Sequence, residues 1–390
     1  MQKKPWKSIL MSPTFKIILL FLSWRFLLFI VLLFAIHVVP LGSPDRFLGG
    51  GPINYQIVPE LFAWANFDGE HYLSIAIFGY KGIEQAFFPA YPMFISFFAK
   101  PISSTFFSFL SNSALVGLII SNVSFLLSLL VLFKLITMDF SKKIAFATIV
   151  VYLLFPTSFY FGSVYNESLF LLLAVSSFYF ARKGNWMLAS IFGFIASATR
   201  VIGFLLLPSL LIEAYQQKSE ISKVFWILLI PFGLILYMGY QYLTINDPIA
   251  FYHLQERVGP QHQQGIILLP QVYYRYIKML STISFDQPIY QTIILEFFSG
   301  ILFFFLPIYG YFKKIRFSYL LFAMLGFLLP NIQGSFSSLP RYVLVLFPSF
   351  LVMGLWINSI SKVLKIIVLF SLGFMLLMET ALFLRGYWIA

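Results

Sequence analysis

The stretch FKIILLFLSWRFLLFIVLLFAIHVV, residues 15–39, decides what kind of fold this chain can adopt. It is an apolar run of about 25 residues, and about 20 are enough for an α-helix to cross a bilayer. Basic residues precede it, as in a signal peptide, but the run is long and has no small-residue cleavage site. We therefore expect an uncleaved first transmembrane helix, with Lys3, Lys4 and Lys7 on its cytoplasmic side.

The rest of the chain has the same apolar character. Its 390 residues are 60% hydrophobic and 10% charged, whereas soluble domains carry about 25% charged residues. Lipid must be the solvent for most of this surface, because a globular core of this size cannot hide it. The net charge of +12 comes from short basic loops, which is typical of a membrane orientation signal and not of nucleic-acid binding. The absence of cysteine excludes disulfides, thiol catalysis and cysteine-bound metals.

The apolar runs predict an all-α polytopic membrane protein that forms one integral-membrane domain over residues 1–390. The stretch 87–110 is apolar but carries three prolines, so we expect a re-entrant or interfacial pair of helices there. We expect about eleven transmembrane helices, at 15–39, 113–137, 144–162, 168–181, 186–199, 201–216, 223–244, 290–312, 317–331, 342–358 and 363–384.

The charges of the connecting loops predict the orientation of these helices. Loops rich in Lys and Arg, such as 142–143 and 313–316, should face the cytoplasm. The loops between them should face outward, including a first loop over 40–112 and a second large loop over 246–289. This alternation requires Arg200 to mark a turn between two short helices.

The first outward loop contains NFDGEHYLSIAIFGY, residues 66–80, with an unusual density of titratable groups. Its apolar spacing fits an amphipathic helix at the membrane interface, with Asp68 near the helix start. There the helix dipole favours the carboxylate form, which is the form that a general base needs. Asp68 can equally be the N-cap of this helix, and a lone histidine such as His71 is more often structural. No second histidine is near, so the metal signal is weak.

Three further charged residues stand at the mouths of apolar runs: Glu167, Arg200 and Arg341. An ionisable group at membrane depth is costly and normally marks a site or a cavity. Arginine binds phosphate oxygens in a bidentate way, so both arginines are candidates for an anionic ligand. A structural ion pair is the alternative for each, with Glu167 a natural partner for Arg200.

Several motifs together resemble the PIG-V type of GPI mannosyltransferases and their bacterial relatives, within the GT-C superfamily of membrane glycosyltransferases. Where this family usually has Trp before the Asp of the first motif, this chain has Phe67, which keeps an aromatic ring. The motifs are FDGEHYLSIAIFGY (67–80), AFFPAYP (86–92), FPTSFYFGSVYNESLF (155–170), ATRVIGFLLLP (198–208) and LPRY (339–342).

The resemblance implies a GT-C-like helix bundle and a mannosyltransferase that inverts the anomeric carbon. It implies a polyprenyl- or dolichyl-phosphate-linked sugar donor, usually mannose, used on the outer or luminal membrane face. An acidic residue of the first loop acts as base in this family, and Asp68 matches that position. The acceptor stays open: a lipid-linked or cell-envelope glycan.

From the residues and the resemblance together we expect a site with three groups of side chains. Asp68 is the catalytic base, and Arg200, Arg341 and Lys81 hold the lipid phosphate. No tightly bound cofactor or metal is expected, because the phosphate leaving group is already charged; a loosely bound divalent cation stays open. The residues expected to contact the sugar and acceptor are Glu70, His71, Tyr72, Tyr80, Tyr91, Tyr165 and Glu167.

Two other functions are compatible with the sequence. The first is a GT-C enzyme that uses another lipid-phosphate sugar, such as glucose or arabinose. The second is a flippase or transporter of a lipid-linked saccharide, although transporters place ionisable groups near the midplane of two related halves. In each case we expect a multi-pass protein of a bacterial cytoplasmic membrane with an outward-facing site, or a luminal site in the endoplasmic reticulum of a eukaryote.

Overall fold

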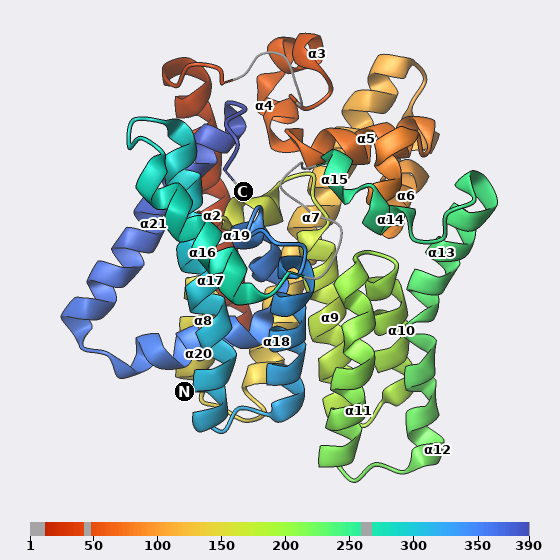
Figure 1. Ribbon diagram of the computed structural model, residues 1–390, viewed down its shortest axis with the longest axis vertical. Coiled ribbons are helices and arrows are strands. Elements are labelled where there is room, and N and C mark those ends of the chain that lie inside the picture. Colours follow the sequence, from red (N-terminus) through yellow and green to blue (C-terminus); the bar gives the residue numbers. More distant parts are fainter. Residues whose placement is uncertain (1–11, 43–47, 259–266, 390) are drawn as a thin grey trace, which may run out of the picture.

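The computed structural model describes residues 12–42, 48–258 and 267–389, and Figure 1 shows its course. The described residues form helices joined by turns, with no β-strand among them. The first helix, α2 (Pro13–Val38), is the expected first apolar span, and the lysines before it lie outside the described residues. The prediction of an all-α polytopic membrane protein is confirmed.

The expected number of about eleven spans is not confirmed. Among the described residues, five helical stretches are long and apolar enough to cross a membrane: α2, α7 (Phe106–Ile136), Ile221–Ile245, Ile289–Phe312 within α17 (Pro288–Phe312), and α21 (Lys362–Leu384). A sixth is the pair formed by Leu339–Val345 and α20 (Phe347–Ser359), bent by 88°. The other expected spans are shorter helices: α8 (Lys142–Leu154), α9 (Glu167–Arg182), α10 (Trp186–Ser197), α11 (Leu206–Gln216) and α18 (Phe317–Asn331).

These short helices end in tight turns inside the protein. Examples are η4 (Ser158–Gly162) before α9 and η5 (Val201–Leu205) before α11. Irregular backbone is tolerated at such depth only where protein covers its polar groups, and both turns are largely buried. The turn expected at Arg200 is confirmed, since α10 ends before this residue and η5 begins after it.

The first large loop is a cluster of short helices: α3 (Pro52–Ile57), α4 (Pro59–Phe62), η1 (Ala63–Ala65), α5 (Asp68–Phe78), η2 (Gly82–Ala86), α6 (Ala90–Ala99) and η3 (Lys100–Ile102). The expected helix pair over 87–110 needs correction. Only α6 is a separate α-helix there; the short turn η3, which contains Pro101, follows it, and α7 begins at Phe106. Thr105 caps α7, accepting a hydrogen bond from the amide of Ser108 at 3.1 Å, so the loop ends before 112.

The second large loop contains α14 (Ala250–His253), α15 (Gln255–Val258) and α16 (Leu269–Thr282). Both α14 and α15 contact η2 of the first loop. In Figure 1 they lie with α5 and α6 at the top of the molecule, whereas α12 (Ile221–Val224) lies at the bottom. We call the top, which contains a cavity, the cavity end, and the bottom, whose loops carry several Lys and Arg residues, the basic end.

Small buried residues let the central helices approach closely. α7 packs along α9, and α9 packs along α10. α7 buries Ser121, Ser124 and Ser128, and Ser177 of α9 donates a hydrogen bond to the carbonyl of Ala189 in α10 at 2.7 Å. Membrane helices associate through such small and weakly polar side chains, because lipid gives no hydrophobic drive between them.

A buried carboxylate joins three helices at the basic end. Glu213 of α11 is fully buried, and its carboxylate accepts hydrogen bonds from the side chains of Arg316, at 2.9 Å, and Gln217, at 2.7 Å. Arg182 at the end of α9 lies 3.5 Å from Glu213 and also donates to Asp139 at 2.7 Å. Two arginines and two carboxylates therefore neutralise one another where α9, α11 and α18 meet.

Candidate active site

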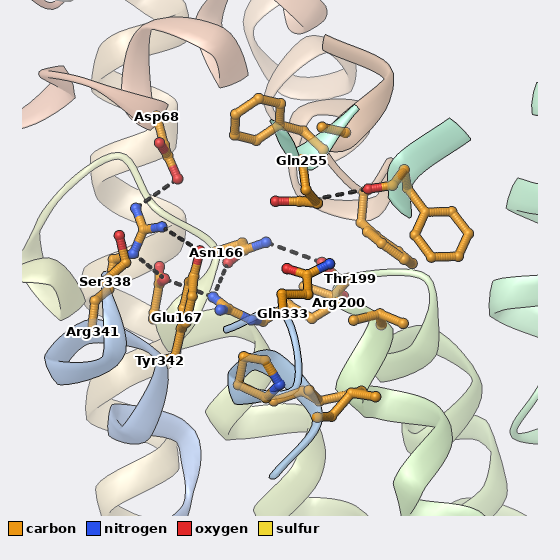
Figure 2. Close-up of a pocket in the computed structure, with 18 of the residues that line it drawn as sticks. Asp68, Asn166, Glu167, Thr199, Arg200, Gln255, Gln333, Ser338, Arg341 and Tyr342 are labelled. Atoms are coloured by element: carbon orange, nitrogen blue, oxygen red, sulfur yellow. Dashed lines mark hydrogen bonds and ion pairs between the residues drawn. The ribbon is translucent and has the colours of Figure 1, made fainter. Parts of the chain in front are cut away.

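A cavity at the cavity end is lined by five of the residues singled out in the sequence: Asp68, Tyr72, Glu167, Arg200 and Arg341. They come from α5, α9, the turn before η5 and the short helix α19 (Leu339–Tyr342). Figure 2 shows Asp68, Arg341, Glu167 and Arg200 linked in one chain of hydrogen bonds and ion pairs. Residues that are far apart in sequence thus form one continuous polar wall.

A strained turn positions Asp68. Phe67, the residue before α5, has φ 57° and ψ −119°, which costs a bulky residue on the order of 1–3 kcal/mol. Asn66 holds this turn: its side chain accepts from the amide of Gly49 at 2.9 Å and donates to the carbonyl of Phe383 at 2.8 Å. The alternative that Asp68 is the N-cap is wrong, because Phe67 occupies that position and Asp68 begins the helix.

Glu167 and Arg200 form a buried pair. Glu167 begins α9, where the helix dipole stabilises the carboxylate. Its Oε1 lies 2.6 Å from Nη1 of Arg200, and the side chains are 2% and 14% exposed. Asn166 accepts from the same guanidinium at 2.8 Å and donates to the carbonyl of Thr199 at 3.0 Å. The expected pairing of Glu167 with Arg200 is therefore present.

Arg341 connects this pair to Asp68. Its Nη1 donates to Oδ2 of Asp68 at 2.6 Å, and its Nε lies 3.7 Å from Oε1 of Glu167. The ring of Tyr342 is 5.0 Å from the Arg341 guanidinium and 5.4 Å from that of Arg200, within range of cation–π attraction. Two guanidiniums, each paired with a carboxylate, thus lie beside one aromatic ring.

Two buried polar atoms of this array have no hydrogen-bond partner among the described residues: Oε2 of Glu167 and Nε of Arg341. Leaving such atoms unsatisfied costs about 1–3 kcal/mol each, and more when the group is charged. The carboxylate oxygen can accept a hydroxyl hydrogen bond, and the guanidinium nitrogen can donate to an anion. Both properties suit a ligand that carries hydroxyl groups beside an anionic group.

One part of the cavity wall is apolar. Val201, Ile202, Leu329, Pro330 and Phe251 line it beyond the charged array. They come from η5, from α18 and from α14 of the second loop. The cavity therefore has a charged part and a hydrocarbon part, which matches an amphipathic ligand.

Burial controls the titration of two neighbouring side chains. Burial, followed by the charges of Glu167 and Asp68, raises the pKa of Tyr72 well above its usual range, so its hydroxyl stays protonated. Burial lowers the pKa of His71, although Asp68 and Glu84 oppose this shift. The His71 ring stacks on Phe87 with centroids 4.8 Å apart.

Six of the expected site residues do not line the cavity: Glu70, His71, Tyr80, Lys81, Tyr91 and Tyr165. The phenol of Tyr80 donates to the carbonyl of Phe87 at 2.9 Å, that of Tyr91 to Gly117 at 3.0 Å and that of Tyr165 to Asn66 at 2.7 Å. The ammonium of the exposed Lys81 lies 4.4 Å from the ring of Phe78. In this structure the hydroxyls of these three tyrosines are therefore bonded to the protein backbone.

The cavity also has lining residues that sequence reasoning did not select. Asn166 is next to Glu167 and Tyr342 is next to Arg341 in the motifs. Their position beside these charged residues is the sequence signal that could have found them. Gln255 lies in the second large loop and Trp388 in the C-terminal segment, where no sequence pattern assigns a role to either residue. The unselected polar and aromatic lining residues are Phe87, Phe88, Asn166, Thr199, Phe251, Tyr252, Gln255, Gln333, Ser338, Tyr342 and Trp388.

Glu70 should make stability depend on pH. Burial raises its pKa from 4.5 to about 7. A carboxyl group with a raised pKa stabilises the folded state fully below pH 4.5, and this contribution is lost as pH rises to about 7. We expect Glu70→Gln to melt close to wild type at pH 5 and above wild type at pH 8. Thermal melts in detergent at both values test this; an equal difference at both would contradict it.

The geometry describes a membrane protein with a charged and hydrophobic cavity at one end of its helix bundle. A family model described as Mannosyltransferase (PIG-V) matches residues 10–244, more than half of the chain. The chain belongs to this family, which confirms the resemblance read from its motifs. The matched region includes Asp68, Glu167 and Arg200 and ends before Arg341.

Other comparisons are more distant. No curated protein sequence matches the chain. The crystal structure of the Archaeoglobus fulgidus oligosaccharyltransferase complex with Zn and sulfate is similar with a TM-score of 0.40 and 14% sequence identity. That similarity covers 93% of this chain and 53% of the oligosaccharyltransferase, so the chain spans about half the length of that protein.

Metal ligands are not concentrated in the described part of the chain. No three His, Asp or Glu side chains within residues 12–42, 48–258 and 267–389 are grouped to hold a metal ion. The expectation that no cofactor is tightly bound stays a prediction.

Proposed function

We propose that this protein transfers a sugar, mannose by its family, from a polyprenyl-phosphate donor to a lipid-linked or cell-envelope glycan. One observation carries the proposal: a single cavity combines a charged array with an apolar wall. A lipid-phosphate sugar has matching parts, because its phosphate and hydroxyl groups suit the charged array and its isoprenoid chain suits the apolar wall.

The charged array supports an inverting displacement. Asp68 takes the proton from the acceptor hydroxyl as that oxygen attacks the anomeric carbon. The bond between that carbon and the phosphate oxygen breaks, and lipid phosphate leaves with the bonding electrons. Glu167 accepts a hydrogen bond from a sugar hydroxyl at its unpartnered Oε2.

Arg341 and Arg200 stabilise the leaving phosphate in this proposal. Arg341 has an unpartnered Nε, so it can bind a phosphate oxygen while Nη1 keeps Asp68 in place. Donors aimed at a developing charge are worth roughly 10²–10³-fold in rate. The array itself is neutral overall, so the guanidiniums are held at low electrostatic cost until the donor arrives.

The distribution of positive charge supports a site on the outer or luminal face. The loops at the basic end contain Lys142, Arg182, Lys223, Lys313 and Lys362, whereas the cavity is at the other end. Cytoplasmic loops of membrane proteins are enriched in Lys and Arg.

A donor panel tests the proposal. Purified protein in detergent is incubated with polyprenyl-phosphate mannose, the glucose and arabinose equivalents, a nucleotide-linked mannose and pooled acceptor lipids. We expect transfer from a lipid-phosphate sugar and none from the nucleotide sugar, because the latter has no chain for the apolar wall. Transfer from the nucleotide sugar alone, or no turnover and no hydrolysis of any donor, would refute the proposal.

The apolar wall should select for donor chain length. Leu329→Gln places a polar amide in this apolar wall. A buried polar group without a partner costs about 1–3 kcal/mol, so we expect the KM for a long-chain donor to rise about tenfold. The KM for a water-soluble short-chain donor should stay within about twofold. Leu328→Gln is the matched control, since this neighbour does not line the cavity. Equal effects on both donors would place the lipid chain elsewhere.

A further inference from the structure

Another buried carboxyl group, that of Glu296, lies behind the cavity wall. Glu296 of α17 is 5% exposed and does not line the cavity. Its Oε2 accepts a hydrogen bond from the hydroxyl of Tyr276 in α16 at 2.7 Å, and its Oε1 accepts one from the backbone amide of Ser338 at 3.0 Å. A carboxyl group buried within an apolar helix is costly unless its oxygens are hydrogen-bonded, so these contacts need an explanation.

The contact with Ser338 acts on the backbone that carries Arg341. Ser338 is the N-cap of α19 and has a left-handed conformation, with φ 61° and ψ 8°. The amide of Arg341 donates to the carbonyl of Ser338 at 3.1 Å. A shift of Ser338 therefore moves Arg341 directly, and a misplacement of 1 Å at a reacting centre can cost about 10²-fold in rate.

The segment before Ser338 is also tied to α16. We call residues 332–338 the Arg341 strap. The carbonyl of Ile332 accepts from the amide of Ile267 at 2.8 Å, and that of Gly334 accepts from the Arg275 guanidinium at 2.9 Å.

An aromatic anchor completes this attachment. Phe336 in the middle of the strap is fully buried, with its ring 4.9 Å from that of Tyr273 and 5.0 Å from that of Tyr276. On α17, a Cβ added at Gly300 would approach the Phe336 ring to 2.8 Å, so this glycine makes room for it. The strap is thus packed against both α16 and α17, and Glu296 holds its last residue.

We propose that Glu296 is a positioning residue for Arg341: it fixes Ser338, and Tyr276 fixes Glu296. This inference rests on the proposed function, in which Arg341 binds the donor phosphate. It also assigns a role to the second large loop, whose helix α16 supplies Tyr276 and reaches the cavity through the strap. Glu296 itself touches no substrate.

Glu296→Ala, Glu296→Gln and Tyr276→Phe test this role. Glu379→Ala is the matched control, because Glu379 of α21 is also buried and bonded to a residue of α17, Gln291, but does not contact the strap. Two quantities are measured on folded protein in detergent: hydrogen exchange of the peptide containing residues 332–342, and the Kd for polyprenyl phosphate. The second measurement needs no sugar transfer.

We expect Glu296→Ala to speed exchange of the Ser338 amide about tenfold or more, since a buried amide left without its acceptor costs about 1–3 kcal/mol. We expect its Kd for polyprenyl phosphate to rise about tenfold or more, because Arg341 is no longer held in place. Glu296→Gln keeps one acceptor oxygen and should lie between wild type and Ala. Tyr276→Phe should have a smaller effect, because Ser338 keeps its acceptor.

Unchanged exchange in Glu296→Ala would overturn the proposal, as would faster exchange with an unchanged Kd. Equal losses in Glu379→Ala would also overturn it, because they would indicate a general loss of structure. If wild type binds no polyprenyl phosphate, the proposed function fails, and the proposed role of Glu296 fails with it whatever the exchange shows. A wild type that binds the lipid, with unchanged exchange in the variant, refutes only the role of Glu296.

Discussion

Asp68→Asn is expected to reduce sugar transfer about 10²–10⁴-fold, the usual contribution of general-base catalysis. The amide keeps the shape of the side chain and can still accept a hydrogen bond from Arg341, but it cannot take a proton from the acceptor. Glu167 remains beside Arg341, 3.7 Å from its Nε, so the guanidinium keeps a counter-charge. The measurement is initial transfer rate with the best donor of the panel, on protein whose thermal melt matches wild type.

Asp139→Asn provides the matched control for this result. Asp139 is also held by an arginine, Arg182, whose Nη2 donates to it at 2.7 Å, but it lies at the basic end. The same chemical change there should leave transfer within about twofold of wild type. Equal transfer by Asp68→Asn and wild type would show that another residue is the base, and Glu167 would be the next to test.

Glu213→Ala is expected to cost about 3–5 kcal/mol of stability, because removing one partner of a buried ion pair leaves the other uncompensated. Arg182 and Arg316 both direct their guanidiniums at this fully buried carboxylate. Their side chains are 11% and 25% exposed, so solvent screens the loss only partly. The measurement is the melting temperature in detergent, with transfer assayed on the fraction that remains folded.

Glu220→Ala is the control for a carboxylate that is not buried. Glu220 pairs with Lys223 at 3.0 Å, but both side chains are more than 60% exposed, at 67% and 64%. An exposed pair of this kind is worth little, and we expect a melting temperature close to that of wild type. A similar loss in both variants would contradict the view that burial makes Glu213 important. A loss of transfer in folded Glu213→Ala would show that the basic end is coupled to the cavity.

Much of the charged array could be predicted from local sequence. Asp68, Glu167, Arg200 and Arg341 are charged residues beside apolar runs, and the cost of a charge at membrane depth makes such positions conspicuous. The structure brings all four to one cavity. The tyrosines were harder, because an aromatic ring suits a sugar site and a buried wall equally. The hydroxyls of Tyr91 and Tyr165 donate to backbone carbonyls of distant segments, and no local pattern predicts these contacts.

The number of spans was the main error in the fold. A window of apolar residues does not distinguish a helix that crosses a bilayer from a shorter one that ends in a turn covered by protein. η4 and η5 interrupt apolar runs in this way, and the hydrogen bonds that satisfy such turns come from residues far along the chain. The carbonyl of Gly162 in η4, for example, accepts from the side-chain amide of Asn122 in α7 at 3.5 Å.

Sequence alone determined that this chain is helical, lies in a membrane and carries its reactive groups in a few short motifs, because hydropathy and charge cost are local properties. Only the tertiary structure decided which of those groups meet. Arg341 reaches Asp68 across most of the chain, and Glu296 holds Ser338 from another helix. Such pairings depend on how helices pack, and packing is set by the summed shapes of many side chains at once.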